Sequence, residues 1–177
     1  MKNNILWITR TAVLTALLIV MQTVTSAFGN TLVTGSIVNL ILIISVMTCG
    51  LSTGLTAVVS PMCAKLLGIG PLWSLIPFII AGNIVLVIIW YFIGNSKIWK
   101  KNFSYIIALV IAALSKFLIL YLGIVQIAIP ILLNLPKPQA TIISNMFSIP
   151  QLITALLGGI LAIIALPFLK RSVKTYQ

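Results

Sequence analysis

The sequence predicts an all-α membrane protein, a compact bundle of about six transmembrane helices. Three observations lead to this fold class: 61% of the residues are hydrophobic, only 6% are charged, and the mean hydropathy is +1.25. A water-soluble domain does not have such a composition. The chain of 177 residues is short for two membrane domains, and no linker or repeat divides it. Residues 1–177 are therefore expected to form one transmembrane domain.

The helices are expected where long apolar stretches run between short segments that favour turns. In chain order, the predicted helices span residues 5–28, 33–48, 52–69, 73–94, 103–131 and 140–169. The segments that separate them are FGN, TCGLSTG, GIGP, GNSKIWKKN and NLPKPQ. Each contains the glycine, proline, asparagine or serine residues at which helices end. The second and third predicted helices are short and are expected to tilt or to lie deep.

The basic residues predict the orientation of the bundle. The net charge is +11, without any Asp, Glu or His. Six spans place three basic clusters on one side: Lys2; Lys97, Lys100 and Lys101; and Lys170, Arg171 and Lys174. Only Lys137 falls in a loop on the opposite side, so the positive-inside rule predicts a multi-pass cell-membrane protein with both termini in the cytoplasm. Because most of the charge sits at helix ends, the lipid bilayer is the expected partner and nucleic acid is not.

A signal peptide is the alternative interpretation of the first predicted helix, because the stretch TSAFG offers a small-residue cleavage site. Its apolar run is longer than that of a usual signal peptide. Cleavage would leave five spans and the same cytoplasmic C-terminus, so the charge rule by itself does not exclude it.

Three basic residues fall inside predicted helices, where a charge is costly. Arg10 lies near the inner end of its helix and can extend to the headgroups. At 1.5 Å per residue, Lys65 and Lys116 each lie about 20 Å from the inner end of theirs, so the two are expected at the same level in the outer half. Both share a helix face with small residues, which mark contacts between membrane helices. Both lysines are therefore expected to point into the bundle.

Polar residues of other helices are expected at a comparable depth and complete a candidate substrate-binding set with the two lysines: Gln22, Asn39, Asn83 and Gln151. They predict a polar cavity in the outer half. Since no carboxylate is present to pair with the lysines, a carboxylate or phosphate of a bound solute is one candidate counterion. Loss of a proton, solvation by carbonyl groups and water, or an anionic lipid are the alternatives, and all remain open.

Catalysis is disfavoured, because the chain lacks the usual general bases, metal ligands and triad members. Cys49 and Cys63 have no CxxC or His partner, and no phosphate-binding GxxxxGK[ST] loop occurs. We therefore predict no enzyme activity, no catalytic residue, no metal site and no cofactor. Proton-coupled transport normally relies on a carboxylate or histidine in the membrane, so a binding protein that other subunits drive is favoured.

The stretch AVLTALLIVMQ, the six short spans and the predicted cytoplasmic termini resemble the substrate-binding S component of energy-coupling factor (ECF) transporters. The resemblance covers nearly the whole chain, and VTGSIVNLILI, GLSTGLTAVVSPMCAKLLGIGP, AGN and MFSIPQLITALLGG are similar to segments of uncharacterised vitamin-uptake S components. In that family, a small-xxx-small motif on the first helix packs against the T component. Ala12 and Ala16 match this motif.

The resemblance implies that a T component and two ATPase subunits supply the energy, while this chain captures a vitamin or related micronutrient. An anionic vitamin such as pantothenate or folate fits better than cationic thiamine, because the chain has no acidic residue. Two other functions remain open. The first is a structural or assembly subunit of a membrane complex, whose lysines would hold lipid phosphates. The second is a stand-alone permease for small solutes.

Overall fold

The computed structural model describes residues 2–69, 72–96, 98, 100–133 and 135–174, except for the side chains of residues 2–4 and 171–174. The regular structure of these residues is entirely helical, without a strand. The all-α class predicted from the sequence is therefore confirmed. In chain order, the elements are α1 (Lys2–Ala27), α2 (Thr31–Cys49), α3 (Leu51–Ala57), α4 (Ser60–Leu66), η1 (Trp73–Leu75), α5 (Ile76–Gly94), α6 (Lys101–Leu120), η2 (Tyr121–Leu133), α7 (Lys137–Met146) and α8 (Ile149–Lys174).

Five helical runs within the described residues are long and apolar enough to cross a membrane. They span Ile5–Ala27, Thr31–Cys49, Trp73–Gly94, Lys101–Leu133 and Lys137–Lys170. This count agrees roughly with the predicted six, and the difference lies in the third predicted helix. The outer surface is strongly apolar, with exposed Val20 and Val24 on α1 and Ile160 and Ile164 on α8. Such surfaces are favourable against lipid and costly in water.

The third predicted helix, residues 52–69, is broken into α3 and α4. Pro61 stands in the first turn of α4, where its missing N–H group cannot bond to the carbonyl group of Ala57. Gly68, with φ of 80°, ends the segment in a conformation that favours glycine. Neither half is long enough to span a membrane alone.

Two other predicted helices each correspond to two consecutive helical elements. Residues 103–131 belong to α6 and the π-helical segment η2, which follows it directly. The predicted helix at 140–169 consists of α7 and α8, which a turn at Phe147 and Ser148 separates. Pro150 cannot donate a backbone hydrogen bond to the carbonyl group of Met146. The side-chain amide of Gln151 donates to that oxygen instead, at 3.2 Å.

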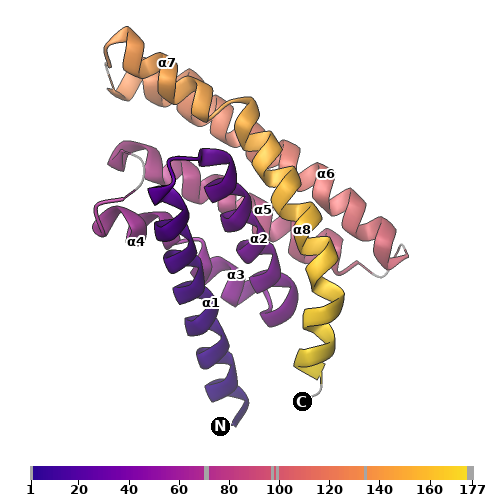
Figure 1. Ribbon diagram of the computed structural model, residues 1–177. Coiled ribbons are helices and arrows are strands. Elements are labelled where there is room, and N and C mark those ends of the chain that lie inside the picture. The colour runs from indigo at the N-terminus through magenta and orange to yellow at the C-terminus, as the bar shows by residue number, and fades with distance from the viewer. Residues whose placement is uncertain (1, 70–71, 97, 99, 134, 175–177) are drawn as a thin grey trace.

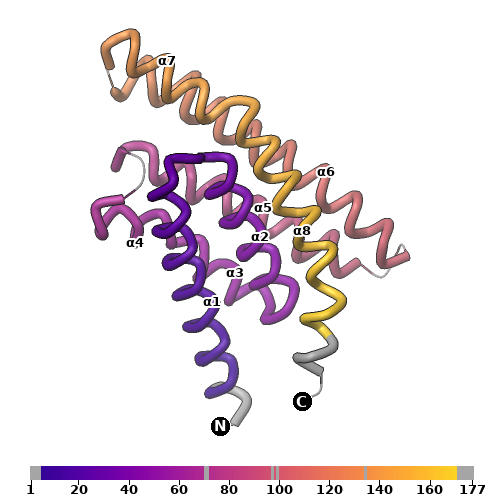
Figure 2. Tube along the Cα trace, in the orientation of Figure 1, coloured from indigo at the N-terminus to yellow at the C-terminus, as the bar shows by residue number. Residues whose placement is uncertain are grey.

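Helix α2 occupies the centre of the bundle and packs between α1 and α8, while α5 packs along α6 (Figure 1). The start of α1 and the end of α8 lie at one end of the bundle. The α1–α2 turn and α7 lie toward the other end, as the trace in Figure 2 also shows. Leu42, Val87 and Trp90 belong to the buried apolar core between these helices. This arrangement leaves a cavity with polar and apolar lining residues toward the end opposite the termini.

Candidate ligand-binding site

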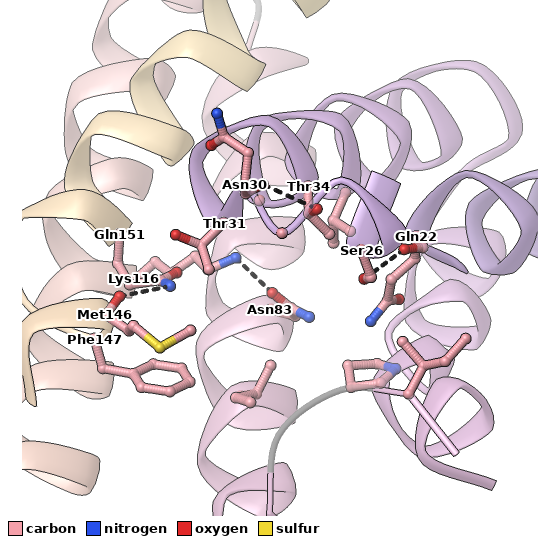
Figure 3. A pocket seen from close by; sticks show the side chains of 16 residues that line it. Gln22, Ser26, Asn30, Thr31, Thr34, Asn83, Lys116, Met146, Phe147 and Gln151 are labelled. Atoms are coloured by element: carbon pink, nitrogen blue, oxygen red, sulfur yellow. Dashed lines mark hydrogen bonds between the residues drawn. The ribbon is translucent and has the colours of Figure 1, made fainter. Parts of the chain in front are cut away.

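A cavity of about 440 Å³ lies between α1, α2, α4, α5, α6 and the α7–α8 junction (Figure 3). Its walls combine polar and apolar side chains. The lining residues are Gln22, Ser26, Gly29, Asn30, Thr31, Thr34, Gly35, Val38, Pro61, Ile69, Ile79, Asn83, Lys116, Met146, Phe147 and Gln151. Among these described residues, Lys116 alone has a side chain that can carry a charge. A concave site of this size with a few convergent polar groups is typical of small-molecule binding.

Lys116 is buried, with 4% of its surface exposed. Its ammonium group donates hydrogen bonds to Asn39 Oδ1 at 2.5 Å and to Asn83 Oδ1 at 2.6 Å. The three residues come from α6, α2 and α5, so three helices must pack correctly to form this group. The two amide oxygens solvate the cation in place of the missing carboxylates. They do not neutralise it, because both amides are uncharged.

The lysine also determines how the two asparagines are oriented. An ammonium group has three donors and no acceptor, so each asparagine must direct its oxygen toward Lys116 and its amide nitrogen elsewhere. The nitrogen of Asn39 donates to Thr154 Oγ1 at 3.5 Å, and Thr154 Oγ1 donates to the Gln151 carbonyl group at 3.0 Å. Asn83 Nδ2, in contrast, is buried and has no hydrogen-bond partner among the described residues.

Most of the polar residues that the sequence singled out meet at this cavity. Gln22, Asn83, Lys116 and Gln151 line it. Asn39 is fully buried and contacts Lys116 without being part of the cavity wall. The structure thus brings these five residues together from five helices.

Lys65 is not among the residues that line the cavity. It lies half-buried on the short helix α4. The predicted depth of Lys65 assumed one continuous helix over residues 52–69, and the break before Pro61 removes that assumption. Lys65 therefore does not line the cavity together with Lys116, contrary to the sequence-based expectation.

Sequence reasoning missed the polar residues around the α1–α2 turn. Asn30, Thr31 and Thr34 line the cavity, although the FGN segment was interpreted only as a helix break. Asn30 accepts hydrogen bonds from the backbone N–H groups of Leu32 and Val33, so it caps α2 at the edge of the cavity. The signal in the sequence that could have identified them was an asparagine in a capping position, Asn30, followed by Thr31 and Thr34. Phe147 had none, because an apolar residue in a membrane helix is ordinary.

Ala12 and Ala16 lie on a different surface of α1. Both side chains are exposed. They border a shallow, mostly apolar depression together with Trp7, Ile8, Thr11, Thr15, Ile19 and Thr56. On its inner side, Thr11 Oγ1 and Thr53 Oγ1 share a hydrogen bond of 2.8 Å. The two alanines are thus not packed between helices of this bundle and remain available to another helix.

Comparison with known proteins finds no matching protein-family model, no matching curated protein and no matching solved structure. The functional argument therefore depends on the residues and their geometry.

Proposed function

We propose that this chain is the substrate-binding S component of an ECF-type importer and that it captures a small anionic vitamin or related micronutrient from outside the cell. The observation that carries the proposal is Lys116. A buried ammonium group, solvated by two neutral amides, faces a cavity of about 440 Å³ that no acidic residue lines.

An anionic solute would supply the charge that the protein lacks. A buried charge is costly unless it is paired, and the chain contains no Asp or Glu. A hydrogen bond between two charged groups is roughly twice as strong as one between neutral groups. Binding of an anion beside Lys116 would therefore gain more than binding of a neutral solute of the same shape.

The distribution of basic residues supports the orientation. With the termini in the cytoplasm, as the positive-inside rule predicts, the cavity lies in the outer half, because Gly29, Asn30 and Thr31 of its lining lie at the α1–α2 turn. That turn lies at the end of the bundle opposite the termini (Figure 1). A cysteine introduced at exposed Asn102, at the start of α6, should then resist an impermeant thiol reagent in intact cells. Labelling of that cysteine from outside would contradict the orientation.

The proposal is tested by substitution of the buried lysine. Lys116→Met should weaken binding of the small molecule that co-purifies with the protein by ~1.5–3 kcal/mol, or about 10- to 150-fold. Mass spectrometry identifies that molecule, and calorimetry measures its affinity. Lys65→Met is the matched control, because it removes the same charge outside the cavity, and its affinity should change less than about twofold.

If Lys116→Met and Lys65→Met bound the ligand with equal affinity, Lys116 would not contribute to binding, and the proposal would be contradicted. Recovery of phospholipid alone would favour a structural subunit instead. Uptake in vesicles that contain this chain without any ATPase would favour a stand-alone permease.

A further inference from the structure

Two residues that line the cavity each carry a buried side-chain atom without a hydrogen-bond partner among the described residues: the amide nitrogen of Asn83 and the side-chain oxygen of Gln22. Asn83 is 1% exposed and Gln22 is 8% exposed, and both residues line the cavity. Buried polar groups are nearly always paired in native proteins. An unpaired donor and an unpaired acceptor in one cavity therefore indicate which groups a ligand supplies.

The donor lies close to the cation. Asn83 Oδ1 accepts a hydrogen bond from Lys116 Nζ at 2.6 Å, and the short bonds of the amide keep its nitrogen within about 5 Å of Nζ. Figure 3 shows the Asn83 amide nitrogen directed away from Lys116, toward the side of the cavity where Gln22 lies. A carboxylate at this position can accept from Nζ with one oxygen and from Nδ2 with the other.

The charge of the cavity favours a monoanion. Lys116 is the one charged residue among the described lining residues. A carboxylate balances this single charge, whereas a phosphate dianion would leave one negative charge unpaired beside apolar walls such as Ile79 and Phe147. A neutral solute would leave the lysine unpaired.

The acceptor adds a second requirement. Gln22 Oε1 accepts no hydrogen bond from the described residues, so a ligand with an N–H or O–H group on this side of the cavity would supply the missing donor. We infer that the ligand is a small monocarboxylic acid with an amide N–H or hydroxyl group a few bonds from the carboxylate. The carboxylate binds Lys116 and Asn83, and the donor binds Gln22. This inference rests on the proposed binding function and names the chemical class of its ligand.

The test uses a matched set of acids rather than the natural ligand. N-butanoylglycine has a carboxylate and an amide N–H. Heptanoate has the same chain length without the amide, N-butanoylsarcosine has a methyl group in place of the amide hydrogen, and sulfate is the dianion. The purified wild-type protein should bind N-butanoylglycine about 10-fold more tightly than heptanoate or N-butanoylsarcosine in calorimetric titrations. Sulfate should not compete with it.

Two variants assign the contacts. Gln22→Met should bring the affinities for N-butanoylglycine and N-butanoylsarcosine within about threefold of each other while the affinity for heptanoate stays within about twofold of wild type. Asn83→Asp should form an ion pair with Lys116 and weaken all three carboxylates by about 100-fold without lowering the unfolding temperature. Gln139→Met, at an exposed position of α7, is the matched control and should leave every affinity unchanged.

The outcomes separate this inference from the proposed function. Similar affinities for the three acids, or a preference for the amide N–H that survives Gln22→Met, would overturn the inference. If binding still disappeared in Lys116→Met, anion capture would remain supported. If no carboxylate bound, or if Lys116→Met bound the acids as wild type does, both the inference and the proposed function would fail. The ratio of the affinities of Gln22→Met for N-butanoylglycine and N-butanoylsarcosine compares two probes on one folded protein. This ratio therefore remains decisive if Asn83→Asp does not fold.

Discussion

Lys116 shows how a cation is held among apolar helices when the chain has no acidic residue. Two amide oxygens from different helices accept its hydrogen bonds. The asparagines are not equivalent, because the amide nitrogen of Asn39 has Thr154 as an acceptor and that of Asn83 has no described partner. Asn39 therefore positions the lysine, whereas Asn83 can contact a ligand as well.

The stability of this group should depend on its members together. In the wild type, Lys116→Met leaves two amide oxygens unpaired and should lower the free energy of unfolding by ~1–3 kcal/mol. In an Asn39→Ala, Asn83→Ala background, the same substitution removes an unsolvated charge and should raise the free energy of unfolding. Denaturant titration of the detergent-solubilised protein measures both values.

The control is Asn102→Ala, an exposed position that should leave the effect of Lys116→Met unchanged. If Lys116→Met lowered the free energy of unfolding both in the wild type and in the Asn39→Ala, Asn83→Ala background, the two amides would not solvate the lysine.

At the scale of the helices, the contact between α2 and α8 holds Asn39 in place, where it accepts a hydrogen bond from Lys116. Gly158 makes this close approach possible. A Cβ atom at this position would lie 2.5 Å from the Ser36 backbone oxygen and 2.7 Å from Asn39 Cβ. At the adjacent Gly159, the nearest atom to an added Cβ belongs to the movable end of the Leu109 side chain. Small residues at such crossings allow the close packing that stabilises membrane helices.

The two neighbouring glycines should therefore respond differently to the same added methyl group. Gly158→Ala should lower the free energy of unfolding by ~1–3 kcal/mol, because the backbone of α2 must shift. Gly159→Ala should lower the free energy of unfolding by less, because the Leu109 side chain can change its rotamer. Comparison of the two unfolding curves, together with binding of the co-purified ligand, tests this. An equal or larger loss for Gly159→Ala would contradict the assignment of Gly158 as the critical contact.

At the scale of the whole molecule, α1 presents two separate surfaces. Gln22 lines the cavity near the α1–α2 turn, whereas Ala12 and Ala16 border an exposed depression nearer the start of the helix. Methyl side chains let a second helix approach closely, which strengthens dispersion contacts in lipid. The proposed function assigns ligand capture to the first surface and the T component to the second.

Substitution of both alanines should separate these tasks. Ala12→Trp with Ala16→Trp should leave the ligand affinity of the solitary protein within about threefold, because neither residue lines the cavity. It should abolish ATP-dependent uptake and co-purification with a T component. The exposed Val13→Trp, Leu17→Trp pair, at the next positions along α1, is the matched control. Intact assembly of the alanine variant would show that this face does not bind the T component.

The sequence by itself determined that the chain is helical, that it suits a membrane and where most helices begin and end. These properties depend on the amount and spacing of apolar residues along the chain, and turn-forming residues such as those around Gly29 mark the boundaries. Helical periodicity was also enough to nominate Gln22, Asn39, Asn83 and Lys116, because a polar residue in an apolar helix is conspicuous.

Only the tertiary structure decided which of these residues meet. Lys65 and Lys116 were equivalent by depth along ideal helices, and the break at Pro61 and the packing of α4 leave Lys65 outside the cavity. Likewise, nothing in the sequence distinguishes Asn39 from Asn83. Their difference depends on whether a third helix offers an acceptor to the free amide nitrogen, and Thr154 does so for Asn39 alone. Whether two helices form a hydrogen bond depends on differences of a few tenths of an ångström in the distance between donor and acceptor. The periodicity of residues along one helix contains no information about such distances.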